Sequence, residues 1–197
     1  MNANVDYMFS EKLEEFPSAP VLILGLGNCL IEDEGIGIAA IEYLHKHYLI
    51  PEDVELLDGG TSGMGLLDDL RSRQYVIVLD AVNTGHQPGN LVVLTNEQVP
   101  AFFRSKVSPH QLALSDVLAV LTLTDEQPKN ISVVGVEPVI LKTRIGLSDK
   151  VKQQLQPMVD EVINQLNDLG YELQPRSPIN SQQHNPLDID YDERTSI

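Results

Sequence analysis

The chain has 197 residues but a single cysteine, Cys29, and no tryptophan. One cysteine excludes an intramolecular disulfide and any zinc site built from several cysteines. No stretch approaches the roughly 18 apolar residues of a membrane span, and residues 1–20 lack the apolar core of a secretory signal. We therefore expect a cytoplasmic protein that has no membrane partner.

Basic residues are also few, because 13 Lys and Arg stand against 29 Asp and Glu, for a formal net charge of -16. Nucleic-acid binding needs clustered cations, so this balance argues against a nucleic-acid partner. The simplest consequence of the charge is solubility, although an acidic surface also attracts basic partners and metal ions.

Several familiar catalytic motifs are missing. There is no G-x-x-x-x-G-K-[ST] phosphate loop and no G-x-S-x-G nucleophile elbow. The segment Gly25-Leu-Gly27 resembles the start of a dinucleotide loop, but Leu30 stands where the third glycine belongs. A tight turn between packed elements explains these glycines equally well. Cys29 is a possible nucleophile, yet one cysteine beside a strand end is more often a core residue.

What the chain does contain is an alternation of apolar strands and amphipathic helices. The patterns predict strands at 20–25, 54–58, 75–80, 91–94 and 131–136, and helices at 36–48, 63–71, from about 108 onward and 151–169. The helix near 108 has Ser108 as a candidate N-cap, Pro109 at its first position and Gln111 in capping-box spacing.

This alternation predicts a three-layer α/β/α sandwich around a twisted, mostly parallel five-stranded sheet. Because residues 81–107 show no obvious crossover helix, the strand at 91–94 is a candidate antiparallel edge strand. We divide the chain into an N-terminal extension at 1–19, one domain at 20–171 and a polar tail at 172–197. The tail is rich in Pro, Ser, Asn, Gln and Asp, a composition typical of disorder.

In open α/β sheets, sites form beyond the carboxyl ends of the strands. Asp58 and Asp80 end two predicted strands, Glu34 follows the first strand, and the loop before the helix near 108 delivers His110. Carboxylates and one imidazole suit Zn²⁺, Ni²⁺, Mn²⁺ or Fe²⁺ and leave coordination positions open. We predict a divalent-metal site formed by Glu34, Asp80 and His110, with His86 as a reserve ligand.

Each of these residues also has a simpler interpretation. Asp58 and Asp80 could cap turns, as Asp often does after a strand. Asp33 or Glu34 could be an acidic residue in the first turn of the 36–48 helix, and His110 could be a surface residue. Each simple interpretation is plausible for one residue alone. It is less expected that all of them hold for residues that meet at the same sheet edge.

Five short motifs, spread over about residues 20–170, resemble those of the nickel–iron hydrogenase maturation endopeptidases, in particular those that serve uptake hydrogenases. In chain order they are Gly25-Leu-Gly27-Asn28 with Asp33-Glu34-Gly-Ile-Gly37, Asp58-Gly59-Gly60-Thr61, Leu79-Asp80-Ala81, Ser108-Pro109-His110-Gln111 and Val134-Gly135-Val136-Glu137-Pro138. Any one of them is a weak signal, whereas five in order are specific.

The resemblance implies an endopeptidase that removes the C-terminal propeptide of the hydrogenase large-subunit precursor after nickel insertion. It implies cleavage after a C-x-x-C-x-x-H/R motif of the precursor. It places the family's metal ligands on Glu34, Asp80 and His110, and it makes Asp58 a candidate catalytic or substrate-positioning residue. The implied metal is nickel presented by the substrate, for which zinc or cadmium could substitute in vitro.

Three hypotheses about mechanism remain open at this point. The three ligands recognise nickel held in the precursor, or they hold a resident metal of a self-contained metalloprotease. Alternatively, the chain is a non-catalytic chaperone or nucleotide-binding module with the same architecture. No exposed heptad pattern is visible, so we expect a monomer.

Overall fold

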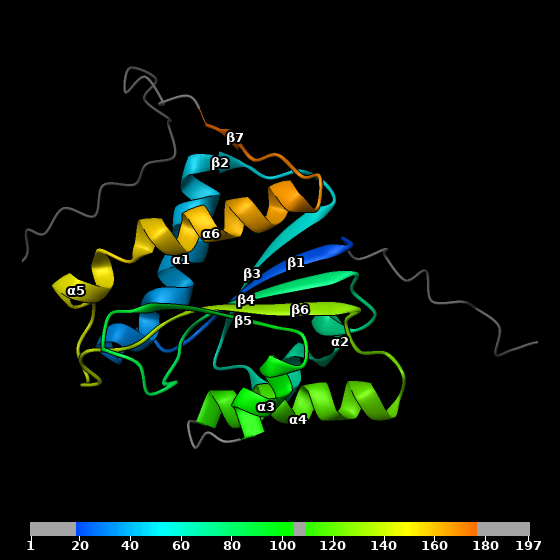
Figure 1. The fold of residues 1–197 in the computed structure, drawn as a ribbon, viewed down its shortest axis with the longest axis horizontal. Helices are drawn as coiled ribbons and strands as arrows, with labels where there is room; N and C mark the ends of the chain where they lie inside the picture. Colours follow the sequence, from blue (N-terminus) through cyan, green and yellow to red (C-terminus); the bar gives the residue numbers. More distant parts are fainter. Residues whose placement is uncertain (1–18, 105–108, 177–197) are drawn as a thin grey trace, which may run out of the picture.

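The computed structural model describes residues 19–104 and 109–176, apart from the side chains of residues 103–113. A five-stranded sheet with the order β3-β1-β4-β6-β5 forms its centre (Figure 1). The strands are β1 (Val21–Leu26), β3 (Val54–Gly60), β4 (Tyr75–Ala81), β5 (Leu91–Thr95) and β6 (Asn130–Val136). Four strands are parallel, and β5 pairs antiparallel with β6 at one edge. The predicted fold class and the antiparallel edge strand are confirmed.

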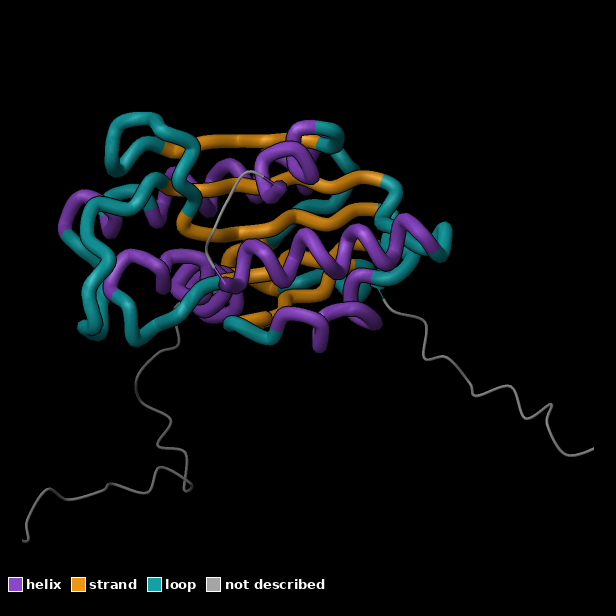
Figure 2. The backbone as a smooth tube through the Cα atoms, turned by 90° about the horizontal axis from the view of Figure 1, so that it is seen from below, coloured by secondary structure: helices purple, strands orange, loops and turns teal. Residues whose placement is uncertain are grey.

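Helices cover both faces of this sheet (Figures 1 and 2). One face carries α1 (Ile36–His47) and α6 (Leu155–Asp168), and the other carries α2 (Leu67–Leu70), α3 (Gln98–Arg104) and α4 (Pro109–Leu123). Two 3-10 turns precede helices, η1 (Glu32–Gly35) and η2 (Gly63–Leu66). None of the described helices has both the length and the apolar character that a membrane crossing requires.

The alternation of side chains along the strands explains the two apolar cores. Val21 and Ile23 of β1 pack with α1 and α6, whereas Leu22 and Leu24 pack with α4 and its neighbours. All six residues of β1 are buried, as expected of a strand with helices on both faces. The same alternation determines the face of the sheet on which each carboxylate at a strand end lies.

The prediction of one continuous last helix is wrong. Instead of one helix over 151–169, the structure has α5 (Asp149–Lys152) followed by α6, with a break at Gln153 and Gln154. Pro157 explains the break, because inside a continuous helix its ring would clash with the carbonyl of Gln153. In the structure Pro157 falls in the first turn of α6, where its missing N–H leaves no hydrogen bond unmade.

Three smaller elements, one helix and two short strands, were not predicted. Helix α3 lies within the 81–107 stretch, where Pro100 and the short length hid its periodicity. The strand β2 (Tyr48–Leu49) pairs antiparallel with β7 (Gln174–Pro175), and Leu173 is buried in the core. Residues 172–176 of the predicted tail therefore pack on the domain, while 177–197 and 1–18 lie outside the described residues.

Candidate functional site

The carboxyl ends of the parallel strands meet at one edge of the sheet, on the left in Figure 1. The register aligns Gly25 of β1 with Asp58 of β3 and with Leu79 of β4, and it aligns Asp80 with Gly135 of β6. Asp58 and Asp80 therefore lie near the carboxyl ends of β3 and β4, the two strands that flank β1.

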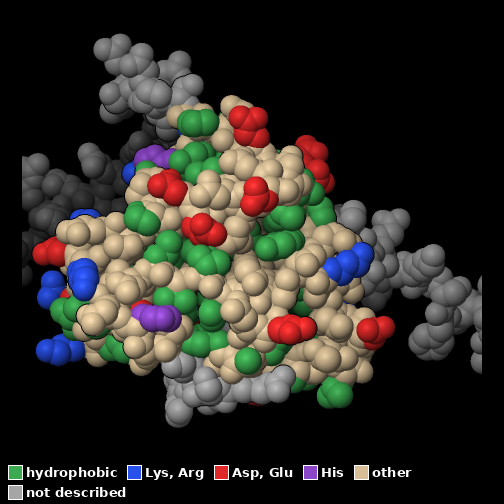
Figure 3. All heavy atoms as spheres, in the orientation of Figure 1, with side chains coloured by type: hydrophobic (Ala, Val, Ile, Leu, Met, Phe, Trp, Pro, Cys, Tyr) green, Lys and Arg blue, Asp and Glu red, His purple; other side chains and the backbone are tan. Residues whose placement is uncertain are grey.

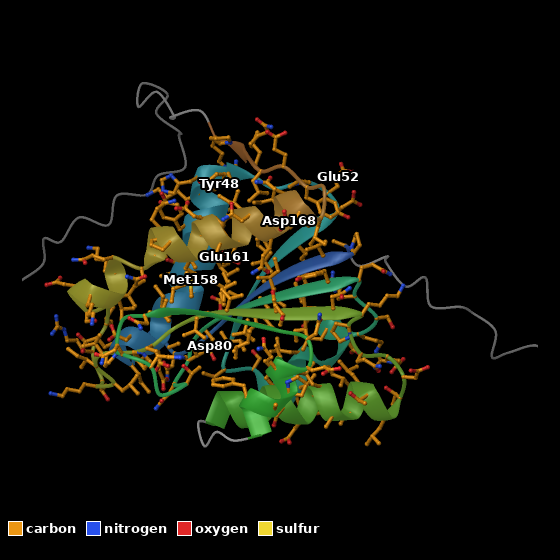
Figure 4. The ribbon with its side chains drawn as sticks, viewed as in Figure 1. Tyr48, Glu52, Asp80, Met158, Glu161 and Asp168 are labelled. Carbon is orange, nitrogen blue, oxygen red and sulfur yellow. The ribbon has the colours of Figure 1, made fainter. Side chains whose placement is uncertain are left out.

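Asp80 is fully buried at the end of the central strand β4. Val76 and Val78 of the same strand belong to the core on the α4 side, so the alternation of the strand directs Asp80 toward that side. Figure 4 labels Asp80 below α6 and close to the sheet. A carboxylate removed from water is costly unless it is paired, which makes this position a strong functional candidate.

Glu34 lies in η1, and glycines bring this turn against the strand ends. Gly27 has a φ of 135°, and a Cβ there would lie 1.8 Å from the carbonyl oxygen of Glu34. A Cβ on Gly37 would lie 2.2 Å from the carbonyl oxygen of Leu79, the residue before Asp80. The two glycines therefore let the Glu34 turn and the start of α1 approach β1 and β4 closely.

His110 is in the first turn of α4, with Pro109 at the first helical position as predicted. Helix α4 leads into β6, which begins at the amino edge of the sheet, so its first turn lies toward the carboxyl edge, as Figure 2 shows from below. The His110 side chain and Ser108 lie outside the description. Among the described side chains, no three His, Cys, Asp or Glu residues gather closely enough to hold a metal ion. The metal triad therefore stays a prediction.

The Asp58 side chain lies on the face of the sheet opposite to that of Asp80. It is exposed, it pairs in register with Gly25, and Leu56 of the same strand packs with the α1 core. One carboxylate oxygen accepts the N–H of Gly60 at 3.0 Å, which is the turn-capping contact considered as its simpler interpretation. Cys29 is exposed, so the expectation that it is a core residue is wrong. Partial burial of the thiol still raises the pKa of Cys29, and the charges of Asp58 and Glu42 raise it further. Asp58 therefore acts on Cys29 electrostatically.

Asp33 has a role that the sequence did not reveal. Its buried carboxylate accepts the N–H groups of Val139 at 2.9 Å, Ile140 at 2.7 Å and Ser148 at 2.7 Å, and the Ser148 hydroxyl at 3.0 Å. It joins the Glu34 turn to a loop distant in the chain. Rather than serving as a first-turn acid of α1, Asp33 fixes this loop beside the candidate site.

Glu137 is another buried carboxylate at this edge, directly after β6. It accepts the N–H groups of Thr84 at 2.7 Å and His86 at 3.1 Å, and also the Thr84 hydroxyl. His86, the reserve ligand, is exposed, and its Nδ1 lies 2.5 Å from the Thr84 hydroxyl and 3.9 Å from Glu137. Glu137 thus shapes the loop after β4, and His86 belongs to that loop.

Comparison with known proteins yields one family. The family model for hydrogenase maturation protease matches residues 38–165. The chain is 44% identical over 160 residues to the hydrogenase 2 maturation protease of Escherichia coli, covering 81% of this chain and 98% of that protein. It is 36% identical over 152 residues to the hydrogenase expression/formation protein HupD of Thiocapsa roseopersicina, covering 76% and 69%.

Solved structures agree with the sequence comparison. The hydrogenase maturating endopeptidase HybD from E. coli aligns with a TM-score of 0.77 at 44% identity, over 79% of this chain and 97% of that one. The [NiFe] hydrogenase maturation protease HybD from Thermococcus kodakarensis aligns with a TM-score of 0.61 at 25% identity, over 74% and 97%. The chain therefore belongs to the hydrogenase maturation protease family and is a peptide hydrolase.

Proposed function

We propose that this protein removes the C-terminal propeptide of a nickel–iron hydrogenase large-subunit precursor after nickel insertion, and that Glu34, Asp80 and His110 recognise the nickel held by that precursor. Family membership supports the peptidase activity over a non-catalytic chaperone. The observation that carries the site is the placement of buried Asp80 and the Glu34 turn at one sheet edge, toward which the first turn of α4 also lies.

The donor set fits a metal of this kind. Two carboxylates and one imidazole suit a borderline divalent ion, but without a thiolate they compete poorly with cysteines for nickel. Nickel bound to precursor cysteines would therefore stay with the precursor and anchor it at the sheet edge. The peptide bond next to the anchored motif would then be held in position for attack by water, which is how proximity lowers a barrier.

Asp58 is our candidate for the group that orients the attacking water or the scissile carbonyl. It is exposed at the same edge, beside β1, on the side of the sheet opposite to Asp80. A substrate peptide would have to cross the end of β1 to reach both groups. If Asp58→Asn processes the precursor at the normal rate, the assignment is wrong.

Mass spectrometry of nickel-loaded precursor, before and after incubation with the purified protein, tests the activity. We expect loss of the propeptide mass. We also expect Glu34→Gln, Asp80→Asn and His110→Ala each to slow cleavage more than about 100-fold, because misplacing the reacting groups is costly. Asp168→Asn is the control, since this exposed residue ends α6 far from the site (Figure 4). An intact precursor that stays bound would instead identify a chaperone.

A self-contained metalloprotease is the second candidate, because the same three residues could hold a resident ion. In that case the purified protein should contain stoichiometric metal. Chelation should abolish cleavage of a nickel-loaded precursor, and added zinc should restore it.

A further inference from the structure

We propose that residues 139–152, together with Leu30, form a docking surface for an acidic segment of the precursor that also carries apolar side chains. The inference rests on the proposed function and concerns the substrate contact beside the candidate site. The 139–152 segment comprises the loop after β6 and helix α5.

The first observation is charge. Lys142, Arg144, Lys150 and Lys152 all belong to the 139–152 segment, which has one acidic residue, Asp149, although the whole chain has only 13 Lys and Arg and a net charge of -16. Arg144 pairs with Glu32 at 3.7 Å, which leaves the three lysines as the main attraction. Figure 3 shows several basic side chains gathered at the left end of the molecule with an acidic one beside them, whereas acidic side chains predominate over the rest of that face, which has basic side chains at its right. An acidic partner is repelled by most of the protein and attracted locally here, so the charges orient its approach.

The second observation is exposed apolar surface at the same place. Among the described residues, nine large apolar side chains are exposed, and four of them are Leu30, Val139, Leu141 and Ile145. Ile145 is 78% exposed and Leu141 is 54% exposed. A hollow of about 230 Å³ opens beside Ile145, with Ile38 and Leu147 in its wall together with the acidic residues Glu32 and Glu42, so it suits an apolar group of the partner and not an acidic one. Apolar side chains grouped in this way are typical of a protein-binding surface.

The third observation is that this surface is fixed relative to the Glu34 turn. The N–H of Glu32 donates to the carbonyl of Arg144 at 2.8 Å, and the N–H of Arg144 donates to the carbonyl of Leu30 at 3.0 Å. The Asp33 carboxylate holds the two ends of the loop through Val139, Ile140 and Ser148. Since Asp33 directly precedes Glu34, a partner seated on the surface would continue directly to the candidate metal site.

Charge reversal tests the basic part of the surface. The variant Lys142→Glu with Lys152→Glu is compared with Lys46→Glu with Lys129→Glu, which makes the same charge change at exposed residues near the amino edge of the sheet. With nickel-loaded precursor, we expect the first variant to raise KM about tenfold at low salt while kcat changes little, and the difference to shrink as salt increases. The second variant should keep the KM of the wild type.

The apolar part is tested in the same way. Leu141→Asn with Ile145→Asn should raise KM, whereas Leu123→Asn should not, because Leu123 is 87% exposed at the end of α4 and away from the surface. Circular dichroism and the midpoint of urea unfolding verify that each variant folds. If a double variant fails to fold, Lys142→Gln and Leu141→Asn alone are measured.

Several results would overturn the inference. Equal KM values for surface and control variants, with cleavage intact, would reject the docking surface and leave the proposed function standing. No cleavage by the wild-type protein would reject the proposed function itself. Sedimentation velocity that shows a wild-type dimer, split by the surface variants, would assign the surface to a second copy of this chain. Cosedimentation with phosphatidylserine vesicles, lost in the charge-reversal variant, would assign it to a membrane.

Discussion

Near the candidate site, the buried carboxylate of Asp33 holds the loop after β6 in place. It accepts three backbone N–H groups and one hydroxyl from the loop after β6. A buried acceptor with several donors is stabilising only while all of the contacts persist, because each donor left unsatisfied has lost its hydration. Truncating Asp33 should therefore loosen the loop as well as lower stability.

We expect Asp33→Ala to lower the free energy of unfolding by about 2–4 kcal/mol, because four donors lose their acceptor. Urea unfolding measures the change, and hydrogen exchange should show faster exchange at the amides of Val139, Ile140 and Ser148. Asp53→Ala serves as control, since Asp53 is exposed and such surface changes usually stay within about 0.5 kcal/mol. An Asp33→Ala protein as stable as the control would show that the loop is held by other contacts.

Cys29 reports on the position of Asp58. Since burial and then the charges of Asp58 and Glu42 raise the pKa of the thiol, less thiolate is present at neutral pH than for an ordinary cysteine. Asp58→Asn removes one of the raising charges, so it lowers this pKa and increases the thiolate fraction. We expect faster alkylation of Cys29 by iodoacetamide at pH 7.5 in Asp58→Asn than in wild type or in Asp53→Asn. An unchanged rate would place Asp58 too far from Cys29 to act on it.

Sequence reasoning at the scale of residues succeeded where a side chain follows a strand and failed where its partner is backbone. The position of Asp80 at a strand end could be predicted because an apolar strand ending on Asp is visible in the sequence, whereas its role as a metal ligand stays a prediction. The roles of Asp33 and Glu137 could not, because the amides that they bind carry no sequence signature. The sequence also could not show that Asp58 and Asp80 end on opposite sides of the sheet, since that depends on the register of three strands.

At the scale of elements, the close packing of α1 on the strand ends sets the position of Glu34. A Cβ at Gly37 would lie 2.2 Å from the carbonyl oxygen of Leu79 and 2.4 Å from that of Leu26, and neither backbone atom can move easily. Because α1 begins two residues after Glu34, any shift of the helix is passed to the site.

We expect Gly37→Ala to lower the free energy of unfolding by about 1–3 kcal/mol and to slow precursor cleavage, because α1 must move away from the sheet. Thermal or urea unfolding and the cleavage rate measure the two effects. Gly65→Ala is the matched control, since a Cβ there meets only the Cβ of Ser62 at 3.7 Å. Equal stability of the two variants would contradict the close approach of α1.

Elements with a clear period were predictable, and those decided by a single residue or by distant pairing were not. All five strands of the sheet were predicted close to their observed bounds, because an apolar strand buried on both faces is a strong local signal. The break between α5 and α6 depends on Pro157, which the apolar stripe concealed. The pairing of β2 with β7 joins segments far apart in the chain, and such short strands have no period of their own.

At the scale of the whole molecule, the carboxyl ends of the parallel strands lie at one edge of the sheet, in a chain whose formal net charge is -16. The fold class followed from the alternation of elements, and the family followed from the order of five motifs. Neither the fold class nor the family motifs reveal which metal the residues at this edge would bind. Two carboxylates and an imidazole can bind a resident metal as readily as a metal carried by a substrate.

The most direct measurement compares the cleavage of nickel-free and nickel-loaded precursor by the same metal-free protein, with the C-terminal propeptide followed by mass spectrometry. If Glu34, Asp80 and His110 recognise nickel in the substrate, only the nickel-loaded precursor loses its propeptide. The difference disappears in His110→Ala, because this variant cleaves neither precursor. Efficient cleavage of the nickel-free precursor would contradict the account.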